Sequence, residues 1–166
     1  MPQLSKKMSG ALNDQINMEL ASAYIYLSMS TYCAEANLRG AASWLRIQWE
    51  EELAHATKLM DYIGERGGSI SLKAIAQPPS KFSSLLDVFE QVLAHEQKVT
   101  AAIHKLYDLA VAEKDPASQA FLQWYVNEQV EEENSPAEII SMLRLVGDSG
   151  SGLLLVDRRL AERARE

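Results

Sequence analysis

Helix-breaking residues in this chain are confined to short stretches, and long amphipathic segments lie between them. Apolar residues recur every three or four positions in each segment, as the 3.6-residue period of a helix requires. The pattern predicts four long helices over about residues 5–36, 41–66, 83–112 and 116–146. Only Pro136 falls inside such a segment, where we expect a kink because the proline ring removes a backbone donor. The sequence therefore predicts an all-α protein.

The connector between the second and third segments decides how the helices are joined. Residues 68–81 include Pro78 and Pro79 and are more numerous than an antiparallel hairpin needs. A connector of this length can run along a bundle and join two parallel helices, as in bundles with one long crossover. A Gly-Ser-Gly turn at 150–152 and a short amphipathic helix over about 153–163 complete a predicted single domain, residues 1–166.

The charge of the chain excludes some classes of partner. Its 166 residues include 16 Lys and Arg against 23 Asp and Glu, a net charge of -7. Phosphate backbones attract basic surfaces, so we expect no nucleic-acid partner, and an acidic protein suits cations better. Charged residues interrupt every apolar stretch before the roughly 20 residues that a membrane span needs. The single cysteine, Cys33, cannot close an internal disulfide and no signal peptide is evident, so we expect a cytoplasmic protein.

Acidic residues interrupt the apolar faces of three predicted helices. In the first helix, Glu19 stands where the period of the face calls for an apolar residue. Glu52 and His55 do so in the second helix, three positions apart on one face, and Glu96 does so in the third. A bare carboxylate in an apolar core is costly, so such groups protonate, pair or bind a metal. Several carboxylates with one imidazole favour a metal ion, and iron is the redox-active choice among Fe, Mn and Zn.

The spacing of these residues repeats in the second half of the chain. The inward pair of the second helix follows Glu19 by 33 and 36 residues, and the same steps from Glu96 reach Gln129 and Glu132. One half therefore offers a Glu and His pair and the other a Gln and Glu pair, which predicts two unequal metal positions. Two further acids flank the second pair, Glu128 and Glu131.

Five segments of the chain match, in order and spacing, the motifs of one family: residues 12–19, 51–55, 95–97, 121–133 and 149–153. Over nearly its whole length the sequence resembles the ferritins, specifically their non-haem bacterial and archaeal branch. The resemblance implies a ferritin-like four-helix bundle with a short fifth helix. It also implies iron storage and detoxification, with ferroxidase activity that oxidises Fe(II) with O2. The subunits would form a hollow homo-oligomeric shell, a 24-mer, with the fifth helix packed around the four-fold axes.

The resemblance also implies roles for individual residues. Two irons would be held by Glu19, Glu52, His55, Glu96 and Glu132. The first iron would lie among the first three of these, and Glu52 would bridge to the second. Tyr26 would donate a hydrogen bond near the first iron, and Gln129 would lie close to the second. A possible third iron would share Glu132 with three further acids, Glu51, Glu128 and Glu131.

Two departures from related families argue against other cofactors. Bacterioferritins repeat the Glu-x-x-His pattern where this chain has Gln129 and Glu132, and they bind haem through a methionine where Leu53 stands here. We therefore expect no haem. One cysteine also cannot supply the two Cys-x-x-Cys pairs of the rubredoxin module that rubrerythrins carry.

Two other functions are compatible with the sequence. A di-iron oxygenase or peroxide-reducing enzyme would use the same bundle without a shell, and a purely structural bundle would hold no metal. Outside the repeat, we expect Trp44, Trp49 and Trp124 to serve packing and His95 and His104 to lie at the surface. Residues 157–166 would form a solvated helix end unless they contribute to assembly, as the resemblance implies.

Overall fold

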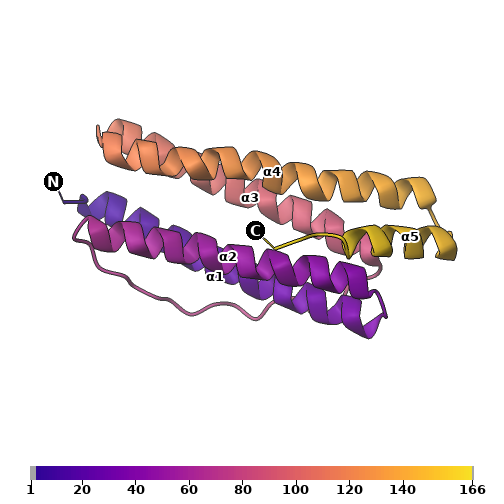
Figure 1. Ribbon diagram of the computed structural model, residues 1–166. Helices are drawn as coiled ribbons and strands as arrows, with labels where there is room; N and C mark the ends of the chain where they lie inside the picture. Colours follow the sequence, from indigo (N-terminus) through magenta and orange to yellow (C-terminus); the bar gives the residue numbers. More distant parts are fainter. Residues whose placement is uncertain (1–2, 166) are drawn as a thin grey trace.

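The protein is a bundle of four long helices with a short fifth helix at one end (Figure 1). The computed structural model describes residues 3–165; Met1, Pro2 and Glu166, which fall within the predicted domain, lie outside this range. No strand occurs in residues 3–165, and no helix there is long and apolar enough to cross a membrane. The all-α fold class is confirmed. The helices are α1 (Lys6–Glu35), α2 (Arg39–Glu65), α3 (Leu85–Ala112), α4 (Pro116–Val146) and α5 (Gly150–Leu160).

The long connector joins the parallel helices α2 and α3 by running along the outside of α1 (Figure 1). The Asn13 amide donates to the Ser69 carbonyl at 3.0 Å, and its Oδ1 accepts from the Ser71 amide at 2.6 Å. Asn17, one turn further along α1, repeats this arrangement with Ser71 and Lys73. These hydrogen bonds satisfy backbone groups of a segment that has no ladder of its own. The crossover predicted from the connector's length is confirmed.

Three of the four long helices begin at a side chain that caps their first turn. Ser5 and Ser84 each accept a hydrogen bond from the backbone amide three residues on, at 2.9 and 3.0 Å. Asp115 caps α4 in the same way, with Pro116 at the first helical position, the residue at which the sequence predicts this helix to begin. Pro136 does not interrupt the helix, since α4 continues for ten residues beyond it, to Val146, and the kink expected there stays a prediction.

The helix α2 has no cap of its own and takes one from α5. Leu38 at its N-cap forms no side-chain hydrogen bond. Instead, the buried carboxylate of Asp157 accepts from the Gly40 amide at 3.1 Å and the Ala41 amide at 2.8 Å. A carboxylate is also favoured at the positive end of a helix dipole. Gly40 allows this approach, because a Cβ there would lie 1.7 Å from the Asp157 carbonyl oxygen.

The predicted fifth helix, 153–163, is displaced along the chain. The residues predicted as a turn form the first turn of α5, because Ser149 caps it by accepting from the Gly152 amide at 3.1 Å. Gly152 also packs closely, since a Cβ there would lie 2.7 Å from Val146 Cβ. The helix ends at Leu160, and the chain then returns along α2 toward mid-length of the bundle (Figure 1). Residues 161–165 therefore do not continue α5 as a solvated helix end but contact α2 through Arg163 and Arg165.

The apolar core is divided into two clusters. One lies toward the α5 end and includes Tyr26 and Phe89. The other lies toward the opposite end and includes Ile16 and Ile103. Along each long helix the buried glutamate falls between the two clusters; in α1, for example, Glu19 stands between Ile16 and Tyr26. The packing thus holds the four helices at both ends of a polar layer.

Replacing Gly40 by alanine is expected to displace α5. The new Cβ cannot fit without moving the Asp157 backbone, which removes the cap of α2, and loss of a cap costs about 0.5–2 kcal/mol. Thermal unfolding and limited proteolysis of the C-terminal segment measure this. The control is Gly64→Ala, in the same helix, where a Cβ meets nothing within 4 Å. Equal stability and equal protection in the two variants would contradict the docking role of Gly40.

Candidate metal centre

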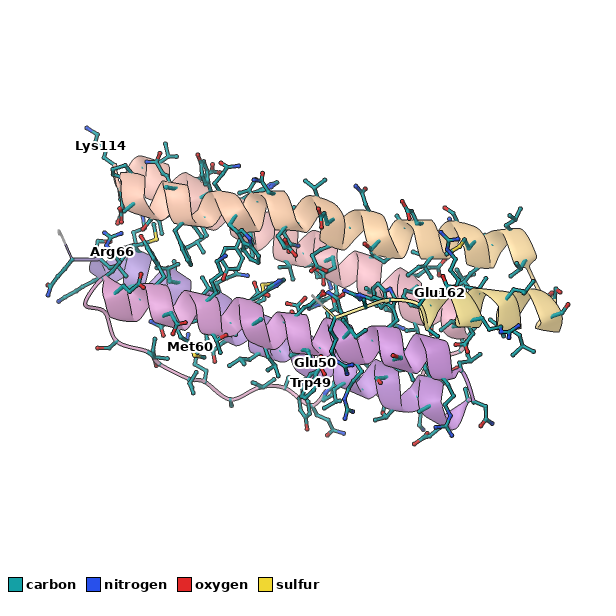
Figure 2. All side chains as sticks on the ribbon, in the orientation of Figure 1. Trp49, Glu50, Met60, Arg66, Lys114 and Glu162 are labelled. Atoms are coloured by element: carbon teal, nitrogen blue, oxygen red, sulfur yellow. The ribbon has the colours of Figure 1, made fainter. Side chains whose placement is uncertain are left out.

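Five potential metal ligands meet in the polar layer between the helix pairs. Figure 2 shows side chains of both pairs reaching into the space between them. They come from four helices, and their exposed fractions lie between 1% and 7%. Each occupies a position that the helical period turns toward the interior. The residues are Glu19 of α1, Glu52 and His55 of α2, Glu96 of α3 and Glu132 of α4.

Two groups of three ligands share one carboxylate. Glu19, Glu52 and His55 each offer an atom within 4.8 Å of the others. His55 Nδ1 lies 3.3 Å from Glu52 Oε2 and 3.9 Å from Glu19 Oε2. Glu52, Glu96 and Glu132 form the second group by the same criterion. Because Glu52 belongs to both groups, the arrangement fits two cations joined by a bridging carboxylate.

The acids predicted to hold a further ion do not all join a three-ligand group. Glu128 joins His55 and Glu132 in a third group, with its Oε1 3.9 Å from His55 Nε2. Glu51 and Glu131 line a neighbouring cavity of about 210 Å³ and belong to no three-ligand group in the described part of the chain. The structure therefore brings Glu128 to the ligand cluster and leaves Glu51 and Glu131 beside it.

Neutral amides orient the carboxylates. Gln15 donates to Glu19 at 2.8 Å, and Gln48 donates to Glu52 at 3.2 Å and to Glu132. Gln15 and Gln48 were not predicted as partners of the ligands. The signal was present, since each stands four residues before a glutamate and therefore on the same helix face.

Glu96 has its own neutral partners. Gln129 Nε2 donates to Glu96 at 3.2 Å and to Thr100 at 3.1 Å. The Tyr26 hydroxyl donates to the other Glu96 oxygen. Tyr26 and Gln129 thus both lie against the second ligand group, whereas Tyr26 was expected near the first.

The carboxylates are held together against their mutual repulsion. Burial raises the pKa of Glu52 well above its ordinary value, and the charges of Glu96 and Glu132 raise it further. Burial, followed by repulsion from Glu52, also raises the pKa of Glu19. Burial is the main cause that raises the pKa of Glu96 to about 7 and of Glu132 to about 8.

Cations would relieve this repulsion, and one ligand atom already lacks a partner. Within residues 3–165, Glu19 Oε2 has no hydrogen-bond donor although it is buried. Buried charges in proteins are normally paired or coordinated. Carboxylate oxygens with an imidazole nitrogen form a donor set that suits Fe, Mn or Zn. The residues present therefore fit the binding of metal ions, which would replace protons on the carboxyl groups.

The prediction that His95 lies at the surface is wrong. Its ring is partly buried, with Nε2 2.7 Å from Ser22 Oγ and its edge directed at the Tyr26 ring, 5.9 Å between centroids. Burial lowers the pKa of His95 to about 4. Because His95 precedes Glu96 by one residue, its side chain is rotated around the α3 axis from that of Glu96. This rotation turns it toward α1 rather than toward solvent. His104 is exposed, as predicted.

The three tryptophans lie in different surroundings. Trp44 is buried and Trp49 partly buried, and both belong to the packing of the cluster near α5. Trp124 is 37% exposed and meets the His55 ring edge-on at 5.3 Å. Lys58 Nζ lies 3.5 Å from the centroid of Trp124. Trp124 therefore covers one side of the metal centre.

A protein-family model, that of the ferritin-like domain of ferritins, matches residues 9–146. This chain belongs to the ferritin family. The bacterial non-heme ferritin of Campylobacter jejuni is 43% identical to this ferritin chain over 155 residues, 93% of each chain. That of Staphylococcus haemolyticus is 40% identical over 161 residues, 97% of each chain.

Solved structures give the same relationship. An engineered closed form of the Archaeoglobus fulgidus ferritin is 49% identical, with a TM-score of 0.97 over 99% of this chain and 100% of that chain. The open-pore ferritin of the same archaeon is 49% identical, with a TM-score of 0.96 over 98% and 100%. The resemblance inferred from the motifs is confirmed. The five potential ligands lie within the matched residues 9–146, whereas α5 and the tail that follows it lie beyond them.

Raising the pH is expected to destabilise this ferritin chain when it is free of metal. Glu132 keeps its proton up to about pH 8 in the folded state, but the ordinary value of 4.5 applies when the chain unfolds. The free energy of unfolding that this proton contributes is fully present below about pH 4.5 and is lost as the pH rises through about 8. Glu132→Gln, which cannot ionise, should lose part of this dependence. Thermal unfolding of both proteins without metal between about pH 5.5 and 9 measures it, and parallel curves would contradict the assigned pKa.

Proposed function

We propose that this ferritin stores iron and oxidises Fe(II) with O2 at a two-metal site inside each subunit. The observation that carries the proposal is the buried pair of three-ligand groups joined by Glu52. Membership of the ferritin family supports iron binding and storage. Iron and dioxygen are both substrates in this reaction, and the ferric product is the stored material.

The geometry suggests a division of labour among the ligands. Glu19, Glu52 and His55 would hold one Fe(II), and Glu52 would bridge to a second held by Glu96 and Glu132. Only the first position has an imidazole, which makes the two positions chemically unequal. A further iron would bind near Glu132 with the remaining acids, Glu51, Glu128 and Glu131.

The protein's own groups favour oxidation of the bound iron. Anionic oxygen ligands stabilise Fe(III) more than Fe(II), because the higher charge gains more from each carboxylate. Two neighbouring Fe(II) ions can each give one electron to the same dioxygen molecule. The Gln15 and Gln48 amides hold the carboxylates in place by hydrogen bonds without adding charge. Tyr26 and Gln129 do the same for Glu96.

We further propose that the subunits assemble into a hollow shell of twenty-four copies in the cytoplasm and bind no haem. The bundle leaves several large apolar side chains near α5 exposed: Leu145 by 88%, Leu154 by 58% and Leu155 by 65%. Exposed apolar surface of this kind is typical of a protein contact. The shell would supply the enclosed space in which oxidised iron accumulates as a mineral.

Removing the bridging carboxylate should abolish fast oxidation. In Glu52→Ala both ligand groups lose a member, so the rate of Fe(II) oxidation measured aerobically by stopped-flow absorbance should fall at least about tenfold. The matched control is Glu138→Ala, which removes an exposed glutamate from α4. A Glu52→Ala rate equal to that of the control would exclude the ferroxidase assignment.

Assembly and storage give a second test. We expect a single large particle in size-exclusion chromatography that retains ferric iron after aerobic loading. Negative-stain imaging should show a hollow core. A monomer or dimer that turns over an organic or peroxide substrate would instead favour the di-iron oxygenase or peroxide-reducing alternative.

A further inference from the structure

The C-terminal tail, residues 161–165, brings a cation to the acidic cavity beside the metal centre. Arg163 Nη2 donates to Glu51 Oε2 at 2.6 Å. Its Nη1 donates to Gln48 Oε1 at 2.9 Å and to the Trp44 carbonyl at 3.3 Å. The guanidinium carbon lies 4.3 Å from the centroid of the Trp44 ring, so the planar group is also stacked. Contacts on its edge and on its face thus fix the position of Arg163.

The other charged residues that line this cavity are all acidic. The cavity has a volume of about 210 Å³, several times the roughly 30 Å³ that one water molecule occupies in the liquid. Among the described residues that line it, Arg163 is the sole cation. Glu132 belongs both to this lining and to the metal centre, which places the two sites side by side. The acidic lining residues are Glu51, Glu128, Glu131 and Glu132.

Gln48 connects Arg163 to the metal ligands. Its Oε1 accepts from Arg163, while its Nε2 donates to Glu132 and Glu52. The opposite amide orientation would direct Nε2 at the guanidinium and Oε1 at the carboxylates, and would lose the hydrogen bonds on both sides. The tail therefore fixes which end of Gln48 faces the ligands.

A second arginine anchors the same tail outside the cavity. Arg165 Nε and Nη2 donate to the two oxygens of Glu50 at 2.7 and 3.1 Å. Glu50 does not line the cavity, and it lies at mid-length of α2, where Arg165 of the tail reaches it (Figure 2). Both partners are substantially exposed, so salt and water weaken this ion pair. The tail is therefore held on α2 by two contacts of different kinds.

We propose that Arg163 is an internal cation that competes reversibly with a metal ion for the cavity next to the metal centre. A metal ion binds there only when the guanidinium leaves Glu51, and the tail then loses its main hold on α2. The inference rests on the proposed function for its biological meaning, because the cavity is where a third iron would bind. The competition itself requires only the cavity and the tail.

Terbium(III) luminescence can test the competition in the assembled, metal-free protein. Terbium is a redox-inert stand-in for a multivalent cation, and excitation through Trp44 reports its arrival in the cavity. In Arg163→Gln the emission should rise at a terbium concentration lower by about tenfold or more, because a neighbouring positive charge has been removed. Arg165→Gln, which breaks the other tail contact, should titrate like the unmodified protein. Arg163→Lys keeps the charge and should also stay close to it.

Each outcome decides the inference. The part of the emission that Trp44→Phe removes in the Arg163→Gln background is the cavity signal, because Trp124 beside the metal centre can excite terbium bound there. No loss of emission on Trp44→Phe would overturn the proposal. Equal midpoints for Arg163→Gln and the unmodified protein would overturn it as well, as would an equal shift in Arg165→Gln. Failure of the proposed function is recognised separately, by Fe(II) oxidation that does not depend on Glu52. The luminescence titration needs neither iron nor turnover.

Discussion

Repulsion among buried carboxylates is the interaction that this ferritin chain must withstand. Glu52 belongs to one ligand group with Glu19 and to another with Glu96, in a layer where these side chains are buried. Neutral amide and phenol donors can orient such groups but cannot cancel their charge. Only protons or metal cations do so, and the raised carboxyl pKa values express that requirement. Two apolar clusters, one on either side of the layer, keep the helices from separating and the carboxylates from moving apart.

The same repulsion links metal binding to proton release. A site whose carboxyl groups hold protons near neutral pH gives them up when cations arrive, so metal occupancy and protonation exclude each other. The nearby cavity adds a third competitor, since Arg163 supplies a positive charge that neither pH nor oxidation removes. Protons, metal ions and a side chain of the tail thus meet within one connected acidic region.

The C-terminal segment stabilises α2 through both negatively and positively charged side chains. Asp157 supplies a negative charge to the amides at the start of α2, where the helix dipole is positive. Arg163 and Arg165 supply positive charges to glutamates in the middle of the same helix. All three residues follow the part of the chain that the family model matches. This segment therefore adds contacts with α2 that the amphipathic pattern of the four long helices does not require.

The helix faces, the crossover and the inward-facing acids were determined by the sequence itself, because the helical period turns residues such as Glu19 and Glu96 to the same side as their apolar neighbours. The equal spacing of the two halves led to Glu132 for the same reason. Tertiary structure alone decided the rest: the burial of His95 against Ser22, the cap that Asp157 gives to α2, and the contact of Arg163 with Glu51. These pairs stand 73, 116 and 112 residues apart, and no local period links them. Their contacts exist only because packed helices bring distant faces together.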